Sequence, residues 1–203
     1  RDRSPSRGLG DVYKRQALLF YAGWELIIVG LLCVLFAFLY TTGPYPLSYN
    51  GWGDVLVIVF FGFVPVGGTY YVQALTWTSD TTVASLICGL LIDTLLVVNN
   101  YRDREADARS GKRTVIVRFG EKFGRYLYLM LGVAASLLCF WFFFEGHLFA
   151  ALLPLLYLIP HVLTWRRMVQ IHSGKKLNSI LGETSRNMLL MGILLSIGFL
   201  IRH

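Results

Sequence analysis

Charged residues are scarce in this sequence. Only 15% of its 203 residues are Asp, Glu, Lys or Arg, whereas 55% are hydrophobic and the mean hydropathy is +0.56. Because soluble domains contain about 25% charged residues, this composition excludes an ordinary soluble globular protein. We expect a membrane protein with no nucleic-acid partner.

Cysteine is also rare. Cys33, Cys88 and Cys139 are isolated within apolar stretches, without a CxxC pair or a histidine at metal-ligand spacing. Zinc centres, iron–sulfur centres and disulfide scaffolds need clustered or regularly spaced cysteines. We therefore expect none of these, and interpret the three cysteines as packing residues.

The sequence is instead rich in long apolar runs. A membrane-spanning helix needs about 20 mostly apolar residues. Six runs approach this length, near residues 22–41, 55–74, 81–101, 126–144, 148–165 and 187–201. The sequence therefore predicts an all-α, polytopic transmembrane helical bundle that forms one domain over residues 17–203.

The first sixteen residues differ from the rest. RDRSPSRGLGDVYKRQ is polar, basic and rich in turn formers, and it ends where the apolar sequence begins at Ala17. A signal peptide would follow its basic region with a short apolar core and a small-residue cleavage site. We interpret residues 1–16 as a non-native-looking or disordered basic tail and give them no functional role.

Apart from the N-terminal tail, Lys and Arg concentrate in two segments, 102–125 and 166–186, which two predicted helices separate. The segments 73–81 and 145–147 contain neither residue. The positive-inside rule then places the basic loops, and the site among them, in the cytoplasm. We expect an integral, multi-pass protein of the inner (cytoplasmic) membrane. The turn-rich loop 42–54 falls on the same side, because successive helices alternate in direction. Contact with anionic lipid is a simple alternative role for the basic residues.

The candidate site lies at the end of the third run, in NNYRDREADARSGKRT, residues 99–114. Asp103 and Asp107 are four residues apart, so on a continuing helix they project from one face. Two bare carboxylates repel each other, whereas Mg²⁺ binds one or two carboxylates together with water and phosphate oxygens. The pair is a candidate magnesium site, although a loop whose acids and bases simply pair has the same composition.

Neighbouring polar residues extend this candidate site. Asn99 and Asn100 lie one turn earlier and offer neutral amide oxygens. Arg102, Lys112 and Arg113 are suited to neutralise the charge of a diphosphate. We interpret all five as candidate substrate-binding residues.

Asp93 lies inside an apolar run, where an ionisable side chain is costly. Its spacing places it on one helical stripe with Asn100 and Asp107. Its side chain has two possible roles, a contact with the substrate or an interhelical hydrogen bond.

The sequence resembles the UbiA-type superfamily of intramembrane aromatic prenyltransferases, most closely the 1,4-dihydroxy-2-naphthoate polyprenyltransferases of menaquinone biosynthesis. NNYRDREADARSGKRTVIVRFG, residues 99–120, is similar to that family's second aspartate-rich motif, and the segment from Tyr40 to Gln73 is similar to its loop and following helix. The likeness covers the chain from Ala17 onward. It adds Tyr40 to the candidate substrate-binding residues.

The resemblance implies nine transmembrane helices around a cavity, with two aspartate-rich motifs facing each other. This chain has six apolar runs, and the Asn-Asp dipeptide that begins the first motif does not occur in it. We therefore expect an N-terminally truncated chain that is inactive on its own.

For an intact enzyme, the resemblance implies magnesium-dependent transfer of a polyprenyl group from polyprenyl diphosphate to 1,4-dihydroxy-2-naphthoate. Asp103 and Asp107 would act as metal ligands and catalytic residues, and the decarboxylated product would be demethylmenaquinone. Other acceptors, such as 4-hydroxybenzoate, homogentisate or a tetrapyrrole, stay open. Two functions of other classes also stay open, namely a membrane transporter and a structural membrane subunit.

Overall fold

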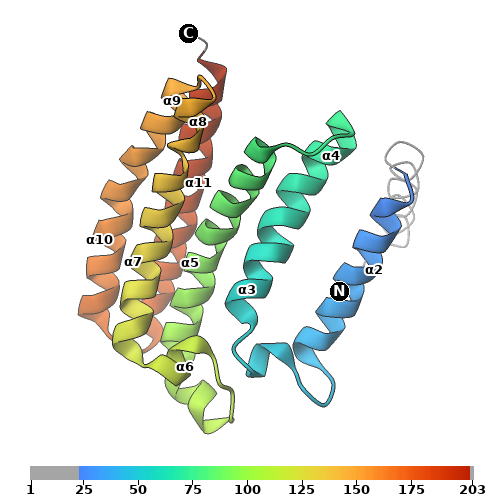
Figure 1. Ribbon diagram of the computed structural model, residues 1–203. Coiled ribbons are helices and arrows are strands. Elements are labelled where there is room, and N and C mark those ends of the chain that lie inside the picture. Colours follow the sequence, from blue (N-terminus) through green and yellow to red (C-terminus); the bar gives the residue numbers. More distant parts are fainter. Residues whose placement is uncertain (1–22, 202–203) are drawn as a thin grey trace, which may run out of the picture.

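A computed structural model describes residues 23–201, and every regular element within that part is helical (Figure 1). The basic tail expected at residues 1–16 lies outside the described residues. The first half of the chain contains α2 (Glu25–Thr41), η1 (Leu47–Tyr49), α3 (Gly53–Val57), η2 (Ile58–Gly67), α4 (Gly68–Ala74) and α5 (Ser79–Arg109). The second half contains α6 (Val115–Phe119), α7 (Glu121–Leu138), α8 (Trp141–Phe144), α9 (Leu148–Leu152), η3 (Leu153–Tyr157), α10 (Leu158–Ile171), η4 (Lys175–Leu177) and α11 (Asn178–Leu200).

These elements join into longer helical segments that match the six apolar runs. Five segments are long and apolar enough to cross a membrane: Gly53–Ala74, Ser79–Arg109, Glu121–Phe144, Leu148–Ile171 and Lys175–Leu200. The helix that matches the first apolar run, α2, is also apolar but has only 17 residues. The predicted all-α polytopic bundle is confirmed.

Two helix boundaries differ from the predicted runs. α5 continues to Arg109, about two turns past the end of its apolar run, and the last segment begins near Lys175 rather than at 187. Both extensions are rich in polar residues, of which Arg102, Asp103 and Glu183 form ion pairs. Hydropathy alone therefore placed these helix ends too close to the apolar core.

Helix α5 is the central element of the bundle. It packs against η2 on one side and against α7 and α11 on the other (Figure 1). Its buried side chains include Ile87 and Leu91 towards the beginning and Val97, Val98 and Tyr101 towards the end. These two groups belong to two separate apolar clusters, so α5 is held along most of its length.

Two glycines allow η2 to approach α5 closely. A Cβ atom on Gly62 would lie 2.5 Å from the Ser85 carbonyl oxygen and 2.8 Å from the Gly89 Cα. A Cβ atom on Gly89 would lie 2.9 Å from the Ile58 Cα. Small residues permit such backbone contact between membrane helices. The contact holds the α3–η2 segment at a defined position beside α5.

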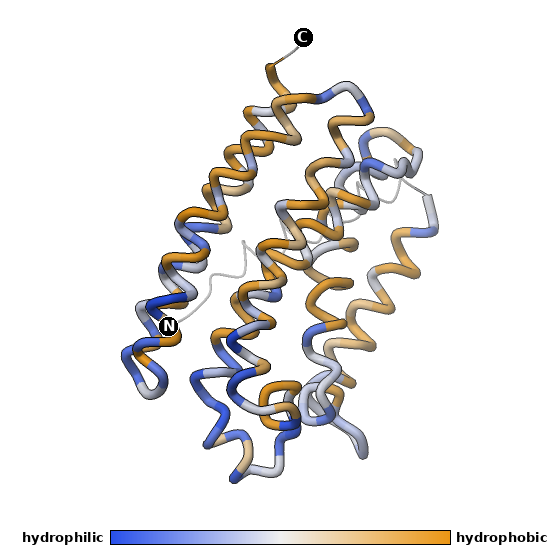
Figure 2. Tube along the Cα trace, turned by 60° about the vertical axis from the view of Figure 1, so that its left-hand side comes forward, coloured by the Kyte–Doolittle hydropathy of each residue, from blue (hydrophilic) through white to orange (hydrophobic). Residues whose placement is uncertain are grey.

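Two loops meet at the end of the bundle where α5 ends. Gly111, with φ +78, follows α5 and allows the chain to turn back. The Arg113 backbone N–H donates a hydrogen bond to the Tyr49 carbonyl at 2.7 Å, and Arg118 Nη2 donates to the Asn50 carbonyl at 2.8 Å. The loop 42–54 and the basic loop therefore share one end, as predicted, and hydrophilic residues gather there (Figure 2).

Candidate functional site

Asp103 and Asp107 lie one turn apart near the end of α5. The helix is continuous through both residues, so the two carboxylates project from adjacent turns of one side, as their spacing predicts. Their side chains are 38% and 13% exposed, respectively. Lys112 Nζ lies 3.4 Å from Asp107 Oδ2 and also attracts Asp103 electrostatically. The two acids and this lysine therefore form one charged cluster.

Arg102 is committed to the same cluster. Its Nε and Nη2 atoms donate to the two carboxylate oxygens of Asp103 at 2.7 and 2.6 Å. Nη2 also donates to Asn99 Oδ1 at 2.7 Å, and Nη1 donates to Asn178 Oδ1 at 2.9 Å. Such a two-pronged arginine–carboxylate pair is strong and directional. In this structure Arg102 thus neutralises Asp103 and ties α5 to the beginning of α11.

A small polar cavity brings together three of the other predicted residues. We call it the polar cavity, and Tyr40, Asn100 and Lys112 contribute to its lining together with Asp54 and Thr114. Its volume of about 10 Å³ corresponds to roughly one water-sized sphere. A diphosphate would fit there only if the loops separated.

Asp54 is a member of the polar cavity that the sequence analysis missed. It stands in the first turn of α3, immediately before the apolar run that begins at residue 55. The sequence signal that could have identified Asp54 was an acidic residue at the beginning of a predicted membrane helix. Its proximity to Asn100 and Lys112, which are distant in sequence, could not be read from that signal.

Arg113 differs from the other predicted site residues. Its side chain is exposed, whereas the neighbouring Lys112 lines the polar cavity. The backbone of Arg113 holds the loop through its hydrogen bond to Tyr49. The structure therefore places Arg113 at the outer edge of the candidate site.

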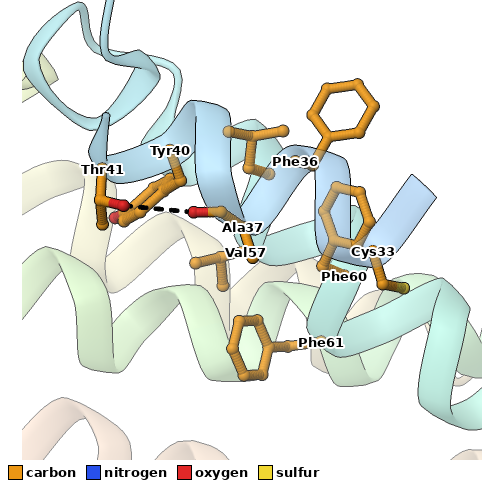
Figure 3. Close-up of a pocket in the computed structure, with 9 residues that line it drawn as sticks. Cys33, Phe36, Ala37, Tyr40, Thr41, Val57, Phe60 and Phe61 are labelled. Carbon is orange, nitrogen blue, oxygen red and sulfur yellow. Dashed lines mark hydrogen bonds between the residues drawn. The ribbon is translucent and has the colours of Figure 1, made fainter. Parts of the chain in front are cut away.

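A larger apolar groove begins at Tyr40 (Figure 3). It lies between α2 and the α3–η2 segment and has a volume of about 620 Å³. Its lining consists of Cys33, Phe36, Ala37, Tyr40, Thr41, Leu56, Val57, Phe60 and Phe61. Because Tyr40 lines both this groove and the polar cavity, an apolar surface and a polar one meet at a single side chain.

Asp93 is buried in the middle of α5, with 1% of its surface exposed. Asn100 on the same stripe is also buried, as the spacing predicts. Within residues 23–201, the Oδ1 atoms of Asp93 and Asp54 have no hydrogen-bond partner, although the two carboxyl groups interact electrostatically. The interhelical hydrogen bond considered for Asp93 is therefore not formed by this oxygen within the described part of the chain.

The sequence was also compared with known proteins. The model of the UbiA prenyltransferase family matches residues 16–197. The chain belongs to this family. No solved structure is a significant match to the chain.

Several curated UbiA-family relatives are similar to the chain. It is 37% identical over 202 residues to a 1,4-dihydroxy-2-naphthoate octaprenyltransferase of Haemophilus influenzae, covering 95% of this chain and 62% of the relative. Proteins of the same name from Mycobacterium leprae and Escherichia coli are 44% identical over 120 residues and 40% identical over 113 residues. These two alignments cover 59% and 56% of this chain, and 40% and 36% of the relatives. The chain thus spans 62% or less of the length of these three relatives.

The carboxylate donors of this UbiA-family chain fit a hard cation such as magnesium better than zinc. The described residues contain no group of three His, Cys, Asp or Glu side chains able to hold a metal ion. Zinc sites require about three or four such protein ligands. Mg²⁺ instead accepts one or two carboxylates and completes its shell with water and phosphate oxygens, which matches Asp103 and Asp107.

Proposed function

We propose that the protein is a magnesium-dependent polyprenyltransferase of the inner membrane, which transfers a polyprenyl group from polyprenyl diphosphate to 1,4-dihydroxy-2-naphthoate. The observation that carries this proposal is the junction at Tyr40. There an apolar groove meets a polar cavity, close to the acidic end of α5, in a chain similar to naphthoate octaprenyltransferases. The family membership favours this activity over a transporter or a structural subunit.

The two surfaces suit the two halves of the donor. Ligand pockets commonly enclose about 300–1,000 Å³, and the apolar groove, at about 620 Å³, lies in that range. A prenyl tail enters this groove from lipid hydrocarbon, so its binding there depends on van der Waals packing against the apolar lining. The diphosphate then lies towards Lys112 and Arg102, whose N–H groups are donors for phosphate oxygens.

The acids and bases of the site have complementary tasks in this proposal. Asp103 and Asp107 would hold the cation, and Mg²⁺ bound there would supply Lewis-acid stabilisation of the diphosphate leaving group. Lys112 and Arg102 exchange their carboxylate partners for phosphate oxygens. Aromatic residues of the groove, such as Phe36 and Phe60, exclude water from the reacting allylic carbon.

The proposed reaction breaks the allylic C–O bond, and the electron pair leaves with diphosphate. The electron-rich ring of the acceptor forms the new C–C bond at the carbon that bears the carboxylate. Loss of carbon dioxide returns the electron pair to the ring and restores its aromaticity. The immediate products are diphosphate, carbon dioxide and demethylmenaquinol, the quinol form of demethylmenaquinone.

The concentration of Lys and Arg at the end of the bundle that carries the site supports a cytoplasmic orientation for it. Reactivity of an exposed loop residue tests this orientation. A Ser110→Cys variant in intact cells should react with a membrane-impermeant maleimide only after the cells are opened. Labelling of intact cells would contradict the orientation.

A chimera provides a direct test of the activity. The chain replaces its matching region in the Haemophilus influenzae relative, and membranes containing the chimera receive labelled polyprenyl diphosphate, an aromatic acceptor and Mg²⁺. We expect transfer to dihydroxynaphthoate, little transfer to hydroxybenzoate or homogentisate, and none with a chelator. The chain assayed alone tests the separate expectation that it is inactive.

Three substitutions in the chimera test the metal ligands. Asp103→Asn and Asp107→Asn should each lower turnover at least about 100-fold, since loss of even a supporting partner of a metal ligand costs about 10–100-fold. Glu105→Gln is the matched control, because this exposed acid lies between the two aspartates on α5. Normal turnover of both aspartate variants, or indifference to chelator, would refute the proposal.

A further inference from the structure

A second groove lies between α10 and α11, on the side of the bundle away from α2 (Figure 1). Its volume is about 450 Å³. We call it the basic groove, because Arg166, Arg167 and Arg186 line it together with a single acid, Glu183. It shares no lining residue with the apolar groove or the polar cavity.

The one acid of the basic groove is already engaged. Glu183 Oε1 forms an ion pair with Arg167 Nη1 at 2.6 Å, and its Oε2 accepts a hydrogen bond from Thr164 Oγ1 at 3.5 Å. Neither Arg166 nor Arg186 has an acidic partner among residues 23–201, and both are exposed. The groove therefore carries two guanidinium groups whose charge is not neutralised.

The two arginines lie close to the boundary between the polar end of the bundle and its apolar surface. Arg166 precedes the end of α10 at Ile171 by five residues, and Arg186 follows the beginning of α11 at Asn178 by eight. At a rise of about 1.5 Å per residue, these offsets are about 8 and 12 Å. Leu163, which is 53% exposed, lines the same groove on the apolar side.

We propose that the basic groove binds the phosphate of an anionic glycerophospholipid. Arginine matches phosphate with two parallel N–H donors, and basic pockets between membrane helices accept anionic headgroups. The exposed Leu163 then contacts the beginning of an acyl chain. A phosphatidylcholine headgroup fits less well, because its quaternary ammonium adds a positive charge beside the two unpaired arginines.

Lipid binding to the full chain in neutral detergent tests this proposal independently of enzymatic activity. Native mass spectrometry would compare phosphatidylglycerol with phosphatidylcholine, and farnesyl diphosphate would serve as a third probe. The Arg166→Gln/Arg186→Gln variant should bind phosphatidylglycerol about thirtyfold more weakly. The Lys175→Gln/Lys176→Gln control loses two positive charges from the exposed turn at the same end, and should change binding less than about threefold.

Each outcome has a defined meaning. Preference for phosphatidylglycerol over phosphatidylcholine, lost only in the arginine variant, supports a built site. Equal losses in both variants, no preference between the lipids, or preferred capture of farnesyl diphosphate by the arginines would each overturn it. Should the double variant not fold, the single variants Arg166→Gln and Arg186→Gln each carry the same test, with an expected loss of about fivefold.

Discussion

Replacing Gly62 by alanine tests the packing that positions the site. The Gly62 Cβ would meet backbone atoms of Ser85 and Gly89 at 2.5 and 2.8 Å, and backbone cannot rotate away as a flexible side chain can. We therefore expect the α3–η2 segment to move outward from α5 in Gly62→Ala. The walls of the apolar groove contributed by Leu56 and Phe60 would move with it.

The magnitude follows from two opposing contributions. Overpacking costs about 1–3 kcal/mol, whereas alanine in place of glycine in a helix stabilises by about 1 kcal/mol. Gly68→Ala is the matched control, because it lies in the same helical segment and its Cβ would have nothing within 4 Å. The helix preference is common to both variants, so their stabilities should differ by the overpacking cost of about 1–3 kcal/mol.

Thermal unfolding in detergent measures this difference. For a chain of about 200 residues, each kcal/mol corresponds to about 2–4 °C in Tm, so Gly62→Ala should melt about 2–12 °C below Gly68→Ala. In the chimera, Gly62→Ala should also lower prenyl transfer while Gly68→Ala leaves it unchanged. Equal melting temperatures for the two variants would show that η2 does not approach α5 as closely as described.

Three further predictions concern residues outside the site, each measured by unfolding in detergent. Gly132→Ala should cost about 1–3 kcal/mol, because its Cβ would overlap the buried ring of His161; equal stability would refute that contact. Tyr128→Phe and Thr184→Val remove the same 3.0 Å hydrogen bond, so their costs of about 1 kcal/mol each should not add; full additivity would count against the bond. Glu121→Gln should cost at most about 1 kcal/mol, less in 1 M NaCl, since its ion pairs are partly exposed; a loss insensitive to salt would contradict an electrostatic origin.

The apolar runs were sufficient to predict the order and approximate position of the membrane helices, but not their ends. The beginning of α11 shows the reason. Glu183 and Asn187 break the apolar pattern there, yet both are buried, because Arg167 and Thr164 on α10 provide their partners. Partners that lie about twenty residues away make a polar residue compatible with a buried helix face, and no local average contains them.

His161 illustrates the opposite case, in which local sequence is sufficient. It follows Pro160 within an apolar run, where hydrogen bonds inside the bundle are the simplest way to satisfy its ring nitrogens. The structure buries it completely, with Nδ1 2.9 Å from the Tyr157 hydroxyl and its ring stacked on Tyr128. An isolated ionisable residue in a helix core has few other ways to be satisfied, so its environment was predictable without knowledge of the fold.

The candidate site also has one part that the sequence predicts and one part that it does not. The spacing of Asp103 and Asp107 determined their common side of α5, because that depends only on helix geometry. The polar cavity depends on three segments, which contribute Tyr40, Asp54 and Lys112. Their proximity arises from packing between helices and could not be inferred from any one motif.

The pairing of acids and bases at the end of α5 gives the proposed function a physical basis. Asp103 pairs with Arg102 and Asp107 pairs with Lys112, so each carboxylate has a neutralising partner. In the proposed function, Asp103 and Asp107 would hold the cation, and Arg102 and Lys112 would exchange these carboxylates for phosphate oxygens of the donor. The exchange would also loosen the contact between Arg102 and Asn178, which joins α5 to α11. Donor binding would then be coupled to the position of α11, rather than confined to the two aspartates.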